Sequence, residues 1–339
     1  MSKKNSSVSL NTGLKEYKDL SSIFLNFKSK LDSLNKKKYL VAVSGGPDSL
    51  ALVALTKAYA DDKKIKFYYV LVDHNIRKNS GLEAKKVKNL LKRKNLNLKV
   101  FVNKKKITKN TQAEARNVRY DILKNFCKKN NIKVIITAHN LEDQVETFLI
   151  RLSRGSGLKG LSAMKVISQI NNDLSLFRPL LDVQKKFLIK ISKTIFGMYF
   201  KDPSNKNKKY LRTNVRNLKK PLEKSGIKYA KIFKSIQNLS NSKITLESYL
   251  NKVINELIKK QNGEILINFK KYKGLNNETK IALINKSIKK LKSNYYDLRS
   301  RKVENLIKNL NNRGFKNSTL GGCVFFKKGG NLCLKREKD

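Results

Sequence analysis

Apolar residues gather in short runs along the first half of the chain, separated by longer stretches whose apolar positions recur every three to four residues. Short runs rich in β-branched and aromatic residues are typical of buried strands, and the longer spacing is typical of helices. The predicted strands cover residues 38–43, 66–73, 98–102 and 133–137. The predicted helices between them cover residues 50–60, 81–94 and 114–130. Because strands and helices alternate, we predict an α/β fold with a doubly wound, Rossmann-like parallel sheet that binds ligands at the carboxyl ends of its strands.

The pattern changes in the second half, where residues 221–261 have wholly helical spacing. Further on, a helix is predicted over residues 297–310, and a β-hairpin over residues 323–334 turns at Gly329 and Gly330, because glycine supplies the positive φ of tight turns. We therefore predict four parts: an N-terminal extension that is partly disordered and then helical, an α/β domain, a helical connector and a small α+β domain. These parts cover residues 1–35, 36–220, 221–262 and 263–339.

Six residues, Ser44–Ser49, join the first predicted strand to the first predicted helix and read Ser-Gly-Gly-Pro-Asp-Ser. Two glycines let backbone N–H groups approach an anion closely, and the start of the following helix adds unpaired donors and the positive end of a dipole. An ordinary strand-to-helix turn would also use glycine and a polar cap, but the full hexapeptide at this junction favours a nucleotide-phosphate site. It is neither a Walker loop, since no Gly-Lys-Ser/Thr follows, nor a GxGxxG dinucleotide fingerprint.

Asp48 lies at the mouth of this loop. A carboxylate next to a triphosphate repels it unless a divalent cation bridges the two, so we expect Asp48 to be a Mg²⁺ ligand. The structural alternative is a helix N-terminal cap, which would stabilise the folded protein by about 1 kcal/mol.

Charge and cysteine content narrow the class of protein. The 339 residues include 76 Lys and Arg against 25 Asp and Glu, a net charge of +51, which predicts a polyanionic partner such as nucleic acid. An AT-rich genome would also enrich Lys, but it would not explain the shortage of acids. Three cysteines without a Cys-x-x-Cys pair indicate neither a disulfide framework nor a zinc or iron–sulfur site. Without an apolar run of about 18 residues or a signal-peptide core, we expect a soluble cytoplasmic protein with no membrane partner.

The segment after the fourth predicted strand carries two carboxylates, Asp143 and Glu146. They lie three residues apart and on a different helix face from the apolar stripe, so both can project into the crevice at the strand ends. Acids in the first turn of a helix also complement its dipole, which is the structural alternative. His139, beside these acids at a strand end, is a candidate contact for phosphate or substrate.

Arginines stand out in a chain whose basic residues are mostly lysine. Arg116 and Arg119 lie one turn apart on a predicted helix that starts with a Thr111–Glu114 capping box. Their guanidinium groups can grip phosphate in a way that lysine does not, although a solvated basic face is the alternative. Two basic loops, residues 151–160 and 201–216, are either mobile linkers or segments that wrap a nucleic-acid backbone.

Taken together, these motifs resemble the tRNA(Ile)-lysidine synthetase family, a branch of the N-type ATP pyrophosphatases of the PP-loop superfamily. The matching segments are residues 44–49, 73–77, 114–120, 139–147, 151–160, 178–181, 202–205 and 212–216. In order and spacing they cover about residues 40–216, and the chain length suits the shorter form of the family. The first hexapeptide is shared by many pyrophosphatases, whereas the later motifs are much narrower. The C-terminal unit resembles the family's tRNA-binding appendage only weakly.

The resemblance implies an ATP-dependent ligase that forms a C–N bond. ATP would adenylate the C2 oxygen of the wobble cytidine in the CAU anticodon of tRNA(Ile), releasing pyrophosphate, and the ε-amine of free L-lysine would then displace AMP to give lysidine. ATP and Mg²⁺ are the implied cofactors, tRNA(Ile) and lysine the implied partners, and a homodimer the implied assembly. Discrimination between tRNA(Ile) and tRNA(Met), which both carry CAU, would depend on surface shape and involve the C-terminal unit.

The resemblance also implies roles for the candidate residues. The Ser44–Ser49 loop would hold the leaving pyrophosphate with Asp48 on Mg²⁺, Asp143 and Glu146 would bind the lysine ammonium or take its proton, and arginines would stabilise charge on the transferring phosphate. The expected catalytic residues are Asp48, Arg119, Asp143, Glu146 and Arg212, with Arg116 and Arg216 as near alternatives for the arginines. The expected nucleotide contacts are Ser44, Gly45, Gly46, Pro47, Asp48, Ser49, His74 and His139. The expected substrate contacts are Arg116, Arg151, Arg154, Arg216, Asp143 and Glu146.

The chain departs from the usual pattern of the family at four positions. Glu142 stands where an Asp is usual, which is a conservative change. Asp73 and Asn75 stand where Asn and Gly are more common, and this difference affects the assignment of His74, which lies between them. Thr213 stands where Asn is common, and this difference affects the assignment of Arg212 and Arg216.

Other functions remain as alternatives. A PP-loop tRNA thiolase would adenylate a base and then deliver sulfur, but such enzymes usually need paired catalytic cysteines or a cluster, which Cys127, Cys323 and Cys333 do not supply. Small-molecule amidotransferases of the superfamily fit the basic charge less well, and a glutaminase domain is missing. A non-catalytic RNA-binding protein would be expected to lose the carboxylates of the site, all of which are present.

Overall fold

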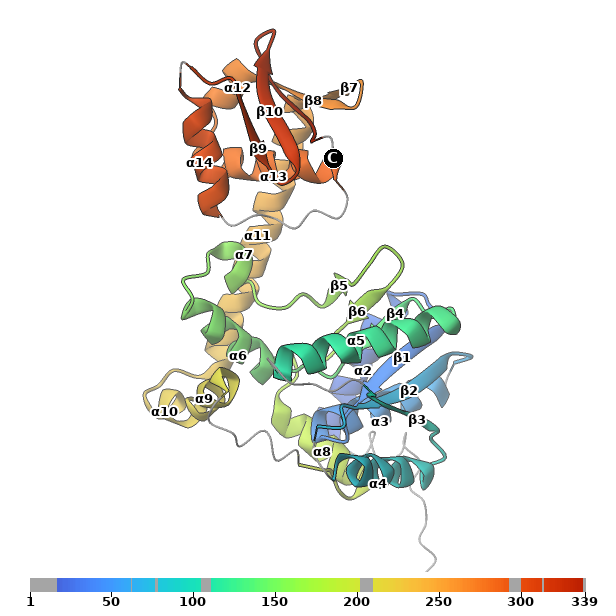
Figure 1. The fold of residues 1–339 in the computed structure, drawn as a ribbon. Helices are drawn as coiled ribbons and strands as arrows, with labels where there is room; N and C mark the ends of the chain where they lie inside the picture. Colours follow the sequence, from blue (N-terminus) through green and yellow to red (C-terminus); the bar gives the residue numbers. More distant parts are fainter. Residues whose placement is uncertain are drawn as a thin grey trace, which may run out of the picture. The chain divides into compact units, whose positions relative to one another are not determined.

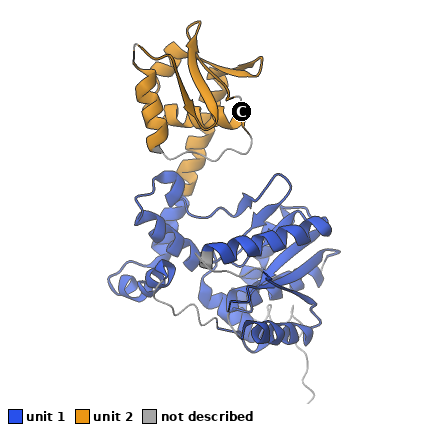
Figure 2. Ribbon diagram, viewed as in Figure 1, with its two compact units in different colours: residues 1–239 blue, residues 240–339 orange. Residues whose placement is uncertain are grey.

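The computed structural model describes residues 17–61, 63–76, 79–104, 111–201, 210–292, 300–312 and 314–337. The chain forms two compact units, residues 1–239 and 240–339 (Figure 2). The division falls inside the long helix α11 (Tyr229–Leu257), within the connector predicted over residues 221–262. The four-part division stays a prediction. Residues 1–16 of the expected extension, and residues 202–209 of the second basic loop, lie outside the described residues.

Unit 1 is built on a six-stranded sheet with the order β3-β2-β1-β4-β6-β5 (Figure 1). Its strands are β1 (Lys38–Val43), β2 (Lys66–Asp73), β3 (Leu98–Val102), β4 (Val134–Ile136), β5 (Ile167–Gln169) and β6 (Ser175–Phe177). Neighbours pair in parallel except β5, which is antiparallel to β6. The four predicted strands and the doubly wound sheet are confirmed, whereas β5 and β6 have three residues each, too few for a periodic signal. The strand order reverses between β1 and β4, where sheets of this kind bind ligands.

Helices cover both faces of this sheet (Figure 1). They are α2 (Lys18–Asp32), α3 (Pro47–Asp61), α4 (Ser80–Lys92), α5 (Thr111–Lys129), α6 (Leu141–Leu152), α7 (Leu158–Leu161), α8 (Lys185–Phe196), α9 (Leu211–Asn217), α10 (Lys219–Lys224) and the first part of α11. Because side chains alternate across a strand, Val41 of β1 joins the core formed with α2, α3, α4 and α8, and its neighbour Leu40 joins the core formed with α5. Helix α3 is buried on all sides over residues 49–56, so the turn at its start is attached to a rigid element.

Unit 2 is a small α+β structure with an antiparallel five-stranded sheet in the order β7-β8-β11-β10-β9. Its strands are β7 (Ile258–Gln261), β8 (Glu264–Asn268), β9 (Asn317–Leu320), β10 (Cys323–Lys328) and β11 (Asn331–Arg336). Its further helices are α12 (Phe269–Lys273), α13 (Asn277–Leu291) and α14 (Ser300–Leu310). One apolar core joins the sheet to α13 and α14. The predicted hairpin is confirmed, since β10 and β11 pair around Gly329 and Gly330, with φ of 55° and 73°.

The end of the predicted connector is wrong. Residues 258–261, predicted as helical, form β7 and pair with β8 in a hairpin. The two residues between these strands are Asn262 and Gly263, with φ of 50° and 78°. Asn-Gly is the pair that two-residue hairpin turns favour, because both positions need positive φ. This local turn chemistry therefore ends the helical segment earlier than its apolar spacing predicts.

Among the described residues, no helix combines the length and the apolar character needed to cross a bilayer.

Candidate active site

The loop of residues 44–49, called the phosphate loop below, lies between the end of β1 and the start of α3, at the point where the strand order reverses. The Ser49 hydroxyl holds the loop together by donating to a loop carbonyl (3.0 Å) and accepting from the Ser44 N–H (3.2 Å). Gly45 has a φ of +80°, and a Cβ atom there would lie 2.4 Å from Cγ2 of Val87 in α4. The loop therefore has one shape, which requires glycine at position 45.

The segment that follows β6 in the chain braces this loop from a second side. Ser192 of α8 donates a hydrogen bond from its hydroxyl to the Pro47 carbonyl. The Phe200 N–H donates to the Gly45 carbonyl (3.0 Å). Sequence reasoning missed these contacts, because the partners lie 145 positions apart in the first case and no periodicity links them.

Asp48 is largely buried beside the phosphate loop. Its Oδ2 lies 3.5 Å from Nζ of Lys185, and its buried Oδ1 has no hydrogen-bond partner among the described residues. Burial raises the pKa of Asp48 to about 6, the Lys185 ammonium opposes that rise, and the carboxylates of Asp143 and Glu142 add to it. An unpartnered carboxylate oxygen beside a phosphate-binding turn fits a hard cation such as Mg²⁺, which keeps water and phosphate oxygens among its ligands. The described residues hold no group of three or more His, Cys, Asp or Glu arranged for a metal.

Asp143 and Glu146 lie in the first half of α6, which follows β4. Asn140 and Asp143 form a reciprocal capping box, in which Asn140 Oδ1 accepts from the Asp143 N–H (3.0 Å) and Asp143 Oδ2 accepts from the Asn140 N–H (3.1 Å). The local stabilising role of Asp143 is thus a helix cap rather than a dipole interaction alone. Its other oxygen, Oδ1, remains available to a second partner.

Two arginines of α9 meet these carboxylates. Glu146, whose side chain is 3% exposed, accepts from Arg216 at Oε1 (2.7 Å), and at Oε2 it accepts from Arg212 (3.0 Å) and Arg216 (3.0 Å). This hydrogen bonding raises the pKa of Arg216. Asp143 Oδ1 lies 3.4 Å from Arg212 Nη2, which is a much weaker contact. The sequence assigned the acids to lysine and the arginines to phosphate as separate groups, whereas the structure joins all four in one network.

His74, which follows the end of β2, also pairs with Arg119 near the middle of α5. His74 Nε2 accepts hydrogen bonds from Arg119 Nε (3.2 Å) and Nη2 (2.9 Å). Burial, followed by the Arg119 charge, lowers the pKa of His74 to about 4, so the imidazole is neutral. Asn75 has a φ of 52°, and its N–H donates to the side chain of Asp73 (2.9 Å), so this turn uses Asn where glycine would also fit.

His139 lies in a strongly positive part of the site. Its Nδ1 is 2.9 Å from the hydroxyl of Thr137. Burial, followed by the charges of four arginines, lowers its pKa to about 3; these are Arg178, Arg212, Arg116 and Arg119. Guanidinium groups from three separate segments therefore make the electrostatic potential at His139 positive, which favours an anionic ligand nearby.

Arg178 had no role in the sequence-based prediction, although it lies in a segment that resembled the family. It is buried, and its Nη1 donates to the Lys165 carbonyl (2.9 Å) and to the Ser168 hydroxyl (3.0 Å). Arg116 lies over the ring of Tyr120, with 4.8 Å from its guanidinium carbon to the ring centre.

The basic loop after α6 has one internal brace. Arg151 donates to the carbonyls of Gly160 (2.7 Å) and Ala163 (2.8 Å), and burial lowers its pKa. Arg154 is exposed. The expected RNA contact of Arg151 stays a prediction, and in the described residues this arginine holds the loop closed.

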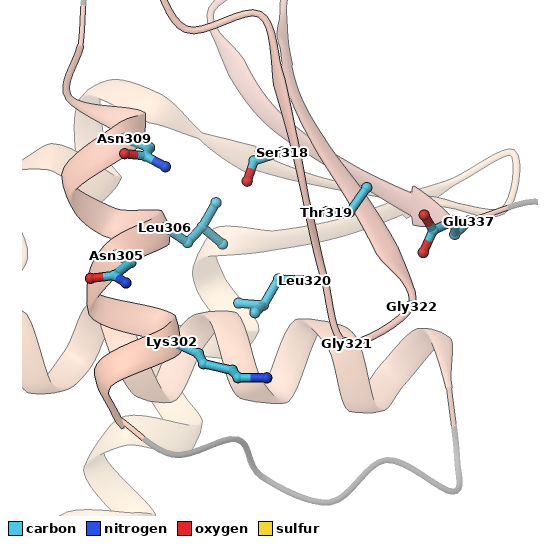
Figure 3. Close-up of a pocket in the computed structure, with 10 residues that line it drawn as sticks. All are labelled: Lys302, Asn305, Leu306, Asn309, Ser318, Thr319, Leu320, Gly321, Gly322 and Glu337. Carbon is cyan, nitrogen blue, oxygen red and sulfur yellow. The ribbon is translucent and has the colours of Figure 1, made fainter.

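Unit 2 contains a groove with a volume of about 560 Å³ (Figure 3). One wall is a polar face of α14, and the other is β9 with the turn into β10, as Figure 3 shows. None of the site residues predicted from the sequence lines it. The groove is lined by Lys302, Asn305, Leu306, Asn309, Ser318, Thr319, Leu320, Gly321, Gly322 and Glu337.

The chain is similar to several known proteins. The PP-loop domain family matches residues 19–222. A tRNA(Ile)-lysidine synthase of Wolbachia pipientis wMel is 33% identical over 302 residues, which are 88% of this chain and 70% of that protein. A tRNA(Ile)-lysidine synthase of Rickettsia typhi is 32% identical over 320 residues, 92% of this chain and 72% of that protein. Among solved structures, the U34-tRNA thiolase NcsA from Methanococcus maripaludis superposes with a TM-score of 0.55 at 18% identity, covering 66% of this chain and 80% of that one, which is a likeness of fold.

Proposed function

The chain belongs to the tRNA(Ile)-lysidine synthase family of PP-loop proteins, and we propose from this premise how its site performs the reaction. The protein is an ATP-dependent ligase that modifies tRNA(Ile) to form lysidine. We propose that its amine substrate is free L-lysine, which it joins to C2 of the wobble cytidine of a CAU anticodon through an adenylated tRNA.

One observation carries the assignment of roles. The carboxyl ends of β1, β2 and β4 bring the phosphate loop, the His74–Arg119 pair and the network of α6 with α9 to one edge of the sheet. An anion-binding turn, neutral imidazoles and a group of arginines are the parts that nucleotidyl transfer requires.

In the first step the C2 oxygen of the cytidine attacks the α-phosphorus of ATP. The bond from that phosphorus to the β-phosphate oxygen breaks, and pyrophosphate leaves. We propose that the phosphate loop holds the departing pyrophosphate with its N–H groups. Mg²⁺ bound at Asp48 would supply Lewis-acid neutralisation of this charge. Arg119, oriented by its hydrogen bonds to His74, would stabilise charge on the transferring phosphate.

Arg212 and Arg216 are proposed to face the same phosphate. Glu146 uses both of its carboxylate oxygens on them, so its proposed role is to orient the two guanidinium groups for substrate. His139 is neutral at neutral pH and adds no charge, so it is proposed as a hydrogen-bonding contact for the nucleotide.

In the second step the ε-amine of lysine attacks C2, and the bond between C2 and the adenylate oxygen breaks to release AMP. The amine must first lose a proton. Asp143 is the better contact for it, because its Oδ1 has only the long 3.4 Å contact with Arg212, whereas Glu146 is saturated. We propose that Asp143 binds the ammonium group and receives its proton or passes it to water.

The thiolase alternative fits the site less well. Delivery of sulfur by a cysteine needs a thiolate, which has to be accessible. Cys127, Cys323 and Cys333 are buried. Burial raises the pKa of Cys127 to about 12 and also raises those of the other two. All three therefore behave as inert core residues.

For unit 2 we propose a role in tRNA binding. The groove at α14 offers Lys302 for a phosphate and Asn305 and Asn309 for sugar or base edges. The net charge of +51 supports a large electrostatic share of RNA affinity. A homodimer is proposed as well, and Leu246 and Tyr249, exposed one turn apart on α11, suit such an interface. Light scattering at several protein concentrations would test it.

The proposed reaction is tested by the stoichiometry of its products. Purified protein is mixed with ATP, L-lysine and a tRNA(Ile) transcript with a CAU anticodon, and pyrophosphate and AMP are quantified. We expect one of each per tRNA modified, with AMP release dependent on lysine and absent with L-leucine. Release of AMP without lysine, or turnover that depends on a sulfur donor, would favour the thiolase instead.

A further inference from the structure

We propose that Lys185 is a phosphate-binding residue of the ATP site and that Glu142 is its positioning residue. This inference rests on the proposed function, since it assumes that the phosphate loop binds the β- and γ-phosphates of ATP. Neither residue was a site candidate from the sequence.

Lys185 is the first residue of α8 and reaches the phosphate loop with its ammonium group. Its Nζ lies 3.5 Å from Asp48 Oδ2, too long for a strong hydrogen bond, and its side chain is 34% exposed. The ammonium group is therefore close to Asp48 without being locked onto it. A lysine at this distance can exchange one anionic partner for another by rotation of its side chain.

The backbone of Lys185 is held by the packing of α8, whereas its side chain is partly exposed. Leu188 and Ile191 of α8 are fully buried, and Ser192 donates to the carbonyl of Pro47 in the phosphate loop. The start of α8 is thus held at a constant distance from the loop. Gln184, which precedes it, provides no side-chain cap for the first N–H groups of the helix.

Glu142 provides that cap from another helix. It is 8% exposed; its Oε2 accepts from the Lys185 backbone N–H (2.9 Å), and its Oε1 accepts from Nζ of Lys219 (3.0 Å). Each carboxylate oxygen therefore connects α6 to a different segment. By accepting the hydrogen bond from the Lys185 N–H, Glu142 fixes the position of the backbone that carries the Lys185 side chain.

Charge explains why a lysine is needed at this place. Pyrophosphate gains negative charge as it leaves, and the carboxylate of Asp48 lies beside the loop that would hold it. In the described structure the Lys185 ammonium offsets the Asp48 charge. With Asp48 bound to a divalent cation, the Lys185 ammonium group would be free to neutralise a phosphate oxygen. A purely structural Lys185 would only pair with Asp48 and would not distinguish ATP from AMP.

The test measures nucleotide affinity of the full chain by calorimetry with Mg²⁺ at pH 8, using ATP, pyrophosphate and AMP as probes. Lys185→Ala should weaken ATP and pyrophosphate binding about 10- to 100-fold, which is typical for loss of one charge-assisted hydrogen bond. AMP binding should change less than about 3-fold, because AMP lacks the β- and γ-phosphates. Lys185→Arg should recover most of the affinity. Lys186→Ala is the matched control, since Lys186 lies over the ring of Phe187, and it should bind like the unaltered protein.

Glu142 is tested by coupling to Lys185. Glu142→Ala should weaken ATP binding about 3- to 10-fold, and the Glu142→Ala/Lys185→Ala double variant should be no weaker than Lys185→Ala. Lys219→Ala, which removes the other partner of Glu142, should leave ATP affinity unchanged.

Equal ATP affinity in Lys185→Ala and Lys186→Ala, or a parallel loss of ATP and AMP, would overturn the inference and leave the proposed ligase intact. Fully additive effects of the Glu142 and Lys185 substitutions would overturn the positioning role. If the unaltered protein bound no ATP, the proposed function itself would fail, and the inference with it.

Discussion

At the scale of single residues, the site depends on groups whose pKa values differ from those of the same residues in water. Asp48 has a pKa of about 6, whereas those of His74 and His139 are about 4 and 3. In each case burial is the first cause, because it disfavours the charged form. At pH 7 the site therefore holds an ionised Asp48 close to its titration point and two neutral imidazoles.

We expect activity to fall in acid with the titration of Asp48. Below about pH 6 its carboxylate is protonated and binds neither Mg²⁺ nor the Lys185 ammonium. The rate at low ATP, kcat/KM, should therefore rise with pH and reach half its maximum near pH 6. Asp48→Asn should lower kcat/KM by about 100-fold or more and leave a flat profile over that range. A profile of Asp48→Asn that still titrated near pH 6 would assign the transition to another group.

The same pKa makes a prediction about stability. Because burial raises the pKa of Asp48 above its ordinary value of 3.8, the folded chain binds this proton more tightly than the unfolded chain. The stabilisation is complete below about pH 4 and is lost as pH rises through about 6. Asp48→Asn should therefore be more stable than the unaltered protein at pH 8, by about 1–3 kcal/mol, with a smaller difference at pH 5. Urea unfolding at both pH values measures this, and a destabilised variant at pH 8 would contradict it.

Glu146 is predicted to stabilise the fold as well as to support activity. Its carboxylate is almost completely buried between Arg212 and Arg216. Glu146→Ala would leave two guanidinium groups without their partner in a partly buried place, at a cost of about 3 kcal/mol. Asp143→Ala should cost about 1 kcal/mol, because it removes a helix cap and one long ion pair. Denaturant midpoints of the two variants test the order, and equal losses would contradict it.

The residue contacts were the least predictable part of the site. Asp143 and Glu146 could be placed together from their spacing on one helix. Their arginine partners lie 66 to 70 positions away, and no pattern along the chain indicates such a pairing. Lys185 and Glu142 were missed for the same reason, since their contact spans 43 positions.

At the scale of elements, prediction succeeded where the signal was local. The buried strands β1, β2 and β3 were predicted to the residue, because apolar runs of five to eight residues leave few alternatives. The strand β7 was missed, since the Asn262-Gly263 turn outweighed the helical spacing that precedes it. The strands β5 and β6 pair with each other and with β4, and this non-local pairing stabilises three-residue segments that no local pattern reveals.

The phosphate loop should not tolerate a side chain at position 45. Gly45→Ala would place a Cβ atom 2.4 Å from Val87 and would also be strained at a φ of +80°. We expect a loss of about 2–4 kcal/mol in the free energy of unfolding and of ATP binding. Gly197→Ala is the matched control, because Gly197 has a φ of +71° but nothing within 4 Å of its Cβ position. Gly45→Ala/Val87→Ala should recover part of the loss; no recovery would show that backbone strain alone is responsible.

At the scale of the whole molecule, the chain carries a net charge of +51 and divides into two units, and we propose that catalysis belongs to unit 1 and part of the RNA binding to unit 2. The phosphate loop and the carboxylate network belong to unit 1, whereas the groove at α14 belongs to unit 2. Affinity for tRNA should therefore fall steeply with salt, while affinity for ATP should not depend on unit 2 residues.

Two lysines of α14 test the proposed groove. Lys302 lines it and Lys308 does not, although both are exposed on the same helix. Lys302→Ala should weaken tRNA binding about 3- to 10-fold, and Lys308→Ala less than 2-fold, with ATP affinity unchanged in both. Filter binding at two salt concentrations measures the effect. Equal losses in the two variants would indicate general electrostatic attraction rather than a groove.

The central claim is that this chain joins lysine to a tRNA base with energy from ATP. Its most direct test is a mixture of the purified protein, ATP, Mg²⁺, labelled L-lysine and a tRNA(Ile) transcript with a CAU anticodon, followed by digestion and mass spectrometry of the tRNA. We predict one lysine per tRNA, attached to the wobble cytidine, no labelling when ATP is omitted, and at least a 100-fold loss with Asp48→Asn. Folded protein that binds ATP and tRNA but leaves the wobble cytidine without lysine would contradict the claim.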